Sequence, residues 1–167
     1  MTREMRRIKQ LLSEEKTIEV MERNTAGVLA VLGDDDYPYA VPISYVYADG
    51  KVYMHSAKEG HKVDAARNHE KASFCVIDKD QIVPEEYTTY FRSAIAFGKI
   101  RLLEGGEEKQ KAAELIGRKY YPAGTDENLS QVINEADKRF IIIALDIEHM
   151  TGKEAIELVQ AEAKQTF

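Results

Sequence analysis

A chain of 167 residues with 44% hydrophobic and 31% charged residues has the composition of a globular protein and can bury a core of its own. Its net charge of −6 argues against a broad nucleic-acid-binding surface. No apolar stretch approaches the length that spans a bilayer, and the basic N-terminus lacks the apolar segment of a signal peptide. We therefore expect a single domain over residues 1–167, located in the cytoplasm, with neither nucleic acid nor membrane as partner. The single Cys75 excludes an intramolecular disulfide, and its apolar surroundings, ASFCVI, predict a buried, inert thiol.

The first half of the chain predicts a helix followed by three antiparallel strands. Apolar residues recur at helical spacing in SEEKTIEVMERN, which predicts an N-terminal helix over about residues 13–24, capped by Ser13. The buried strand AGVLAVLG leads into a hairpin at GDDDYP. The strands YAVPISYVY and VYMHS then follow, and the Asp49-Gly50 pair between them is a strong hairpin signal.

The second half alternates helices and strands. A helix to about Asn68 precedes the strands KASFCVID and SAIAFGKIRLL, and two helices are expected in EEKQKAAELIGRKYYP and NLSQVINEADK. The β-branched run FIIIALDIEH predicts a central strand. A C-terminal helix over about residues 153–164 follows, which Thr151 and Glu154 would start as a capping box. Six strands with few helices between them predict a mainly-β fold, a small antiparallel barrel with peripheral helices; consecutive hairpins argue against a doubly wound parallel sheet.

The stretch HSAKEGHK, residues 55–62, is a candidate anion site. Ser56 and Glu59 have the spacing of a capping box, and Gly60, His61 and Lys62 would form the first helical turn. A helix N-terminus offers free N–H groups, and the added Lys, Ser and Gly suit a phosphate. An ordinary capped helix with solvent-facing charges explains the same residues, and the glycine patterns of a Walker loop and of a dinucleotide fingerprint are missing.

Two strands carry further candidates. Pro42 cannot donate to a β-ladder, so it indicates a strand edge or a bulge; alternation places it with Ser44 on the face opposite to Ile43 and Tyr45. In SAIAFG, alternation places Ala94 and Gly98 on a smooth face that suits close approach by another sheet, a partner subunit or an aromatic cofactor.

Other chemistries find little support. His61 and His69 do not share a helical face, and no thiol or carboxylate completes a zinc set, so we expect no metal. No Gly-x-Ser-x-Gly elbow is present. The acids of GDDDY are better explained by a solvated turn than by a calcium loop.

Taken together, VPISYVYADGKVYMHSAKEGHK, IVPEEYTTYFRSAIAFGKI and HMTGKEA resemble the flavin-binding split-barrel proteins of the pyridoxamine-phosphate-oxidase-like superfamily, in particular the Nim-type nitroimidazole-resistance branch. The resemblance covers roughly residues 5 to 157. It implies a six-stranded split barrel that forms a homodimer, with FMN, or FAD in some members, at the subunit interface.

The resemblance also implies a set of cofactor-binding residues. The flavin phosphate would be bound by Ser56, His61 and Lys62, with His55 and Ala57 close by. The isoalloxazine would be lined by Pro42, Ile43, Ser44 and Tyr45. The site would be completed by Ser93, Ala94, Ile95 and Gly98, plausibly from the other subunit, and by Thr151, Gly152 and Lys153. His55 is the candidate catalytic residue.

The expected activity is flavin-dependent reduction of a small acceptor, such as a nitroaromatic or quinone, by a reduced nicotinamide. His55 would be either the proton donor or a structural histidine that is hydrogen-bonded at the rim of the barrel. The basic phosphate pattern of pyridoxamine-phosphate oxidases is missing, which argues against vitamin B6 oxidation. Two alternatives remain open: a flavin-binding protein without turnover, and a split barrel that binds another ligand such as haem. The sequence leaves the physiological acceptor and the choice between FMN and FAD undecided.

Overall fold

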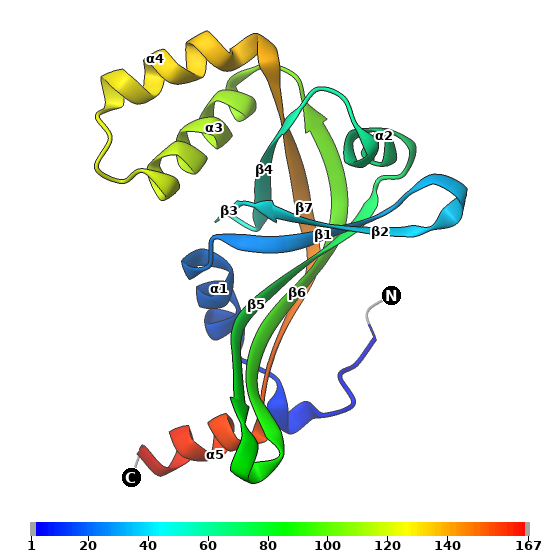
Figure 1. Ribbon diagram of the computed structural model, residues 1–167, viewed down its shortest axis with the longest axis vertical. Helices are drawn as coiled ribbons and strands as arrows, with labels where there is room; N and C mark the ends of the chain where they lie inside the picture. Colours follow the sequence, from blue (N-terminus) through cyan, green and yellow to red (C-terminus); the bar gives the residue numbers. More distant parts are fainter. Residues whose placement is uncertain (1–2, 166–167) are drawn as a thin grey trace.

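The computed structural model describes residues 3–165, which form one seven-stranded antiparallel sheet and five α-helices (Figure 1). The strands are β1 (Ala26–Leu32), β2 (Pro38–Ser44), β3 (Val46–Ala48), β4 (Lys51–Ala57), β5 (Lys71–Val83), β6 (Thr88–Leu103) and β7 (Phe140–Glu154). The helices are α1 (Glu14–Arg23), α2 (His61–Asn68), α3 (Glu107–Tyr120), α4 (Asp126–Ala136) and α5 (Ile156–Gln165).

Local signals form the two hairpins at the start of the sheet. Asp49 and Gly50 both have positive φ, 50° and 74°, as a type I′ turn requires, and Ala48 pairs with Lys51 across it. The acidic turn at Asp34–Asp36 joins β1 to β2. Both predicted hairpins are therefore confirmed.

The sheet has the order β2-β1-β5-β6-β7-β4-β3, and the expected count of six strands was wrong. The predicted strand YAVPISYVY is interrupted at Tyr45, which separates β2 from β3. The Tyr45 N–H donates to the Tyr120 hydroxyl at 2.9 Å, and this hydroxyl also contacts the carbonyls of Thr25 and Tyr45. A side chain from α3 thus takes the place of a neighbouring strand, and β2 and β3 form opposite edges of the sheet although they are consecutive in the chain.

The interior of the curved sheet is filled by large apolar side chains around Tyr45, Phe74 and Met54. Ala94 and Ala96 of β6 face this interior and are fully buried. A Cβ atom at Gly98 would lie 2.0 Å from the Asp146 carbonyl oxygen, so this position requires glycine. The smooth face of SAIAFG therefore packs inside the barrel and offers no open surface; the opposite face of β6 is exposed.

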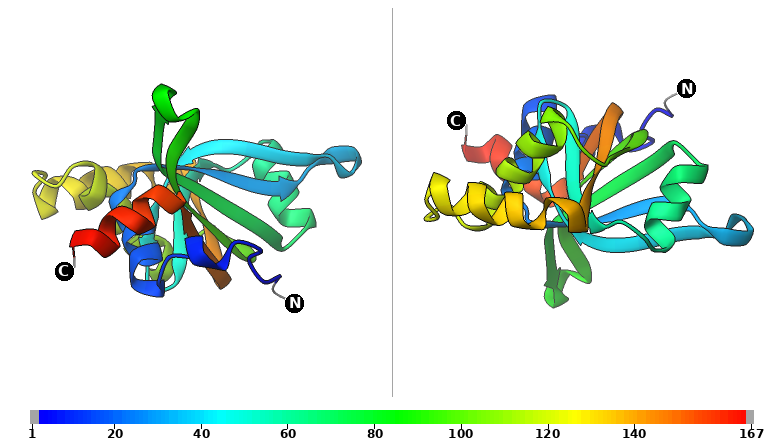
Figure 2. Two further views of the ribbon diagram at one scale, coloured as in Figure 1. Left: turned by 90° about the horizontal axis from the view of Figure 1, so that it is seen from below. Right: turned by 90° about the horizontal axis from the view of Figure 1, so that it is seen from above.

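The helices lie outside the sheet, with the α3–α4 hairpin at one end and α5 at the other (Figures 1 and 2). Helix α1 is capped as predicted, because the Ser13 hydroxyl accepts from the Lys16 N–H at 3.3 Å. The predicted capping box of Thr151 and Glu154 was wrong: β7 continues through Glu154, and α5 begins only at Ile156. Thr151 instead pairs with Ile95 of β6, since the ladder bonds of two long paired strands outweigh a local cap.

Among residues 3–165, no helix combines the length and the apolar character that crossing a membrane requires.

Candidate functional site

The turn between β4 and α2 presents unpaired polar groups. Gly60 precedes α2 with φ 126°, and no side chain caps this helix. The N–H groups of Val63 and Asp64 both bond the Gly60 carbonyl, which leaves the first N–H groups of the helix without a bond among the described residues. The predicted capping box of Ser56 and Glu59 was therefore wrong.

Ser56 lies in β4, where it pairs with Ile141 of β7 and is only 5% exposed. Its Oγ is buried and has no hydrogen-bond partner in the described part of the chain. A buried hydroxyl without a hydrogen-bond partner costs free energy, so a ligand that forms a hydrogen bond with it would stabilise the protein. Ala57, the next residue, is exposed at the end of the strand.

Lys62 and His61 differ in their surroundings. Lys62 is partly buried and forms neither a hydrogen bond nor an ion pair within residues 3–165. The His61 imidazole stacks on the Tyr39 ring, with centroids 4.1 Å apart, and its Nε2 accepts from the Asp34 N–H at 3.4 Å. His61 thus joins the α2 start to the β1–β2 hairpin, next to the strand that carries Pro42 and Ser44.

A row of paired residues crosses five strands of the sheet: Pro42, Val28, Cys75, Ile95 and Thr151. Because paired residues share a face, this row places candidates from β2, β6 and β7 on one outer surface. Ser44 follows Pro42 on this surface at the next outward position of β2.

The outer surface continues through a second pair on the long strands. Ser93 pairs with Lys153, whose ammonium lies 5.3 Å from the centre of the Phe91 ring. Phe97 and Ile77 on the same surface are 48% and 64% exposed. The sheet therefore presents an apolar outer surface with a few polar groups.

Five of the predicted residues face away from the outer surface. Ile43 and Tyr45 pack on the core, Ala94 and Gly98 lie on the buried face of β6, and Gly152 lies against Leu12 and Thr17. Burial also raises the pKa of the Tyr45 hydroxyl well above its ordinary value. The side chains of Ile43, Tyr45 and Ala94 do not reach the outer surface and glycine has none, so only the backbone of these residues could contribute to a site there.

His55 stands apart from this surface. It is exposed on β4, opposite Ile142, and borders an apolar hollow of about 300 Å³ between β4 and the α3–α4 hairpin. Ile142 in turn pairs with Leu103, which lies eight residues along β6 from Ile95. That separation is about 26 Å of strand, so His55 and Ile95 of one chain cannot contact the same ring system.

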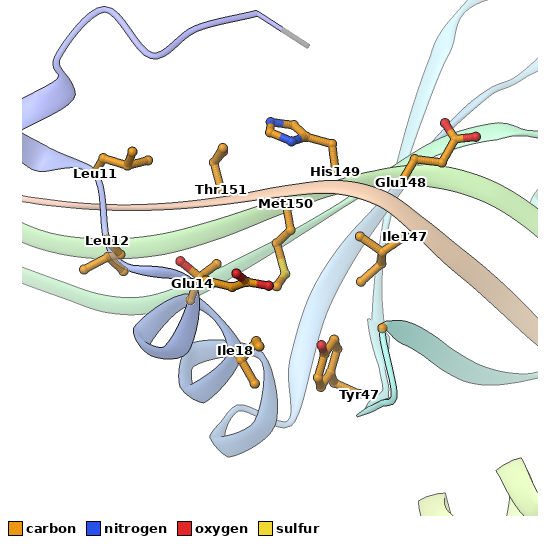
Figure 3. A pocket seen from close by; sticks show the side chains of 12 residues that line it. Leu11, Leu12, Glu14, Ile18, Tyr47, Ile147, Glu148, His149, Met150 and Thr151 are labelled. Carbon is orange, nitrogen blue, oxygen red and sulfur yellow. The ribbon is translucent and has the colours of Figure 1, made fainter. Parts of the chain in front are cut away.

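Sequence reasoning missed His149. It pairs with Phe97, and their rings are nearly parallel, with centroids 6.4 Å apart. His149 and Thr151 border three adjoining hollows, two of which also involve the N-terminal arm, residues 3–7. In Figure 3 their side chains lie on the side of β7 that faces this arm, whereas Met150 points toward α1 and Tyr47. The spacing of His149 and Thr151 by two residues on a strand was the available signal.

We also considered Cys75 as a nucleophile and the acidic, His and Cys side chains as metal ligands. Cys75 is half-buried and lies in the outward-facing row, so the expected burial holds only in part; desolvation raises the pKa of its thiol, and its inert role stays a prediction. No group of three or more His, Cys, Asp or Glu side chains within residues 3–165 has an arrangement that could hold a metal ion.

The family model for pyridoxamine 5'-phosphate oxidase matches residues 13–154, which is most of the chain. The chain belongs to the pyridoxamine 5'-phosphate oxidase family. This membership confirms the resemblance that the sequence motifs indicated. A search among curated proteins gives no match.

Solved structures of other proteins show the same fold. A protein from Bacteroides thetaiotaomicron, named for 5-nitroimidazole antibiotic resistance, is 21% identical with a TM-score of 0.72, and 86% of each chain is covered. A conserved hypothetical protein from Mycobacterium tuberculosis is 18% identical with a TM-score of 0.77, over 90% of each chain. An FAD-binding protein from Mesorhizobium loti is 24% identical with a TM-score of 0.59, over 87% of this chain and 97% of the other.

Proposed function

We propose that this member of the pyridoxamine 5'-phosphate oxidase family binds a flavin and acts as an oxidoreductase on a small acceptor. The observation that carries the proposal is the buried Ser56 hydroxyl without a partner, five residues before His61, the uncapped start of α2. Together with the unpaired Lys62, these groups match a phosphate, which accepts hydrogen bonds and carries negative charge. The FAD-binding relative from Mesorhizobium loti supports the same class of ligand.

The phosphate would lie at the β4–α2 turn, and the isoalloxazine on the outer surface of the sheet. His61 bridges these two regions through Tyr39. The outer surface around Pro42, Ile95 and Thr151 carries exposed apolar side chains, which suit contact with a ring system. The phosphate group suits FMN as cofactor; FAD would bind through the same contacts.

We further propose a homodimer in which this outer surface packs against a second copy. Exposed apolar side chains, among them Ile77, Ile95 and Phe97, favour burial against another sheet. The long distance between His55 and Ile95 within one chain supports a site to which both subunits contribute.

A bound flavin supplies two-electron transfer from a reduced nicotinamide to a small acceptor such as a nitroaromatic or quinone. The role of the protein is to position the reactants, exclude water and supply a proton. His55, which is exposed and forms no hydrogen bond among the described residues, is the first candidate donor. The sequence lacks a second basic cluster for a substrate phosphate, which argues against vitamin B6 oxidation.

The absorbance spectrum of the purified protein tests this proposal. We expect flavin bands, FMN as the released cofactor by mass spectrometry, and loss of the bands when a reduced nicotinamide is added without oxygen. Flavin bands that persist would identify a binding protein without turnover. A haem spectrum, or a colourless protein that binds neither FMN nor FAD on titration, would contradict the proposal.

A further inference from the structure

We propose that the acceptor binds between the N-terminal arm and the β6–β7 surface, with His149 as the hydrogen-bond donor to its nitro or carbonyl oxygen. This inference rests on the proposed function, because it names the acceptor subsite of the same flavin centre. It concerns a different histidine from His55 and a different cavity.

The size and the walls of this cavity support a small planar ligand. The two hollows under the arm measure about 620 and 710 Å³, and they share His149, Thr151 and Met5 in their walls. Phe97 adds an exposed aromatic ring that is inclined by only 19° to the imidazole. A cavity that combines an aromatic wall and apolar side chains with polar groups is typical of a small-molecule site.

The charges around the cavity favour a neutral ligand. Arg3 and Arg6 of the arm are balanced by Glu4 and Glu148. A carboxylate or phosphate would gain little from this arrangement, whereas a nitroaromatic or quinone carries no charge that needs a partner.

The position of His149 agrees with the proposed ring site. Phe97, its partner across the strands, is two residues from Ile95, and Thr151 is two residues from His149 on the same face. His149 forms no hydrogen bond among the described residues, so its N–H is available to a ligand. The hollow beside His55 is smaller, about 300 Å³, and all its other lining residues are apolar, which leaves fewer polar contacts for an acceptor.

Histidine NMR distinguishes the two cavities, because the chain has four histidines: His55, His61, His69 and His149. Each imidazole signal is assigned by a single His→Gln variant in the oxidised protein supplied with FMN. The neutral probe 4-nitrobenzyl alcohol is then titrated. We expect the His149 signal to shift with saturation, and His149→Gln to raise the Kd of the probe about three- to tenfold, as loss of one hydrogen bond predicts. His69→Gln, a change at an exposed residue after α2, should leave the Kd unchanged.

A shift of the His55 signal with an unmoved His149, or no binding of the probe, would overturn the inference. The remaining imidazole signals report whether His149→Gln is folded. FMN titration of the same sample separates the two claims. If FMN does not bind, the proposed function fails and the acceptor role fails with it; if FMN binds and His149 does not respond to the probe, only the acceptor site is wrong.

Discussion

Lys62 lies in the first turn of α2, partly buried and unpaired within residues 3–165. A lysine held near a helix N-terminus faces the positive end of the helix dipole, which an isolated cation would avoid. Its position is favourable only when an anion is bound there. The contribution of Lys62 can therefore be measured by comparing a ligand that carries the phosphate with one that lacks it.

We predict that Lys62→Ala raises the Kd of FMN by about ten- to a hundredfold, the effect of losing one charge-assisted hydrogen bond. Riboflavin, which lacks the phosphate, should bind the variant as tightly as the wild type. Fluorescence titration of both ligands measures the two constants. Lys111→Ala, an equal change of charge at an exposed position on α3, is the control. Equal weakening for FMN and riboflavin would contradict a phosphate contact.

At the scale of elements, a cluster of charged side chains joins α1 to the long strands. Arg23 of α1 donates two hydrogen bonds of 2.6 Å to Asp78 of β5, and Asn24 adds a third at 2.8 Å. Arg92 of β6 lies 3.6 Å from Asp78 and donates to Glu154 of β7 at 2.9 Å. Burial works to raise the pKa of the Asp78 carboxyl, but these hydrogen bonds and charges outweigh it and hold the pKa below its ordinary value.

We predict that Asp78→Asn lowers the free energy of unfolding by about 1–3 kcal/mol at neutral pH, because Arg23 loses an anionic partner whose side chain is only 8% exposed. Because the pKa of Asp78 is lower in the folded than in the unfolded protein, its ionised carboxylate stabilises the fold at pH values above the ordinary carboxyl pKa. This contribution is lost as the pH falls through the pKa of the folded state. The difference between wild type and variant should therefore shrink below about pH 4. Urea unfolding at several pH values measures it, with the exposed Asp80→Asn as control. A difference that stays constant down to low pH would contradict the ion-pair explanation.

At the scale of the whole molecule, the exposed sheet surface determines the proposed assembly. Ile77, 64% exposed on β5, would be buried in a homodimer. We predict that the wild type is dimeric in sedimentation equilibrium and that Ile77→Glu shifts it toward the monomer at least tenfold, since a buried unpaired carboxylate is costly. Tyr87→Glu, at the fully exposed tip of the β5–β6 hairpin, should remain dimeric. A monomeric wild type, or an unaffected Ile77→Glu dimer, would refute this surface as the interface.

The features that the sequence predicted correctly are those whose partners are close in the chain. The Asp49-Gly50 turn and the Ser13 cap depend on neighbouring residues, so their patterns suffice. The break at Tyr45 depends on the Tyr120 hydroxyl, which lies 75 residues away, and the inward face of Ala94 depends on the curvature of the sheet. No local pattern carries such information.

The same limit applies to the candidate site. Alternation correctly placed Pro42 and Ser44 opposite to Ile43, yet it could not indicate which face of β6 would be open. The resemblance assigned His55 and Ile95 to one site with Ile95 from the other subunit, and their separation within one chain depends on the register of β4, β7 and β6, which no local pattern gives. His149 was missed because the hollows that it lines are formed together with the N-terminal arm, which is distant from β7 in the chain.

The break at Tyr45 also bears on how the barrel forms. Closing a sheet normally requires its two edges to find each other across a long stretch of chain, and the entropy lost grows with the length of that loop. Here the edges β2 and β3 are joined through a single residue. Once the β1–β2 hairpin and the β3–β4 hairpin have formed, the first and last strands of the sheet are already tethered, so closure adds almost no loop entropy of its own. The slow step in folding should then be the pairing of β7 with β4 and β6, which brings together residues distant in the chain.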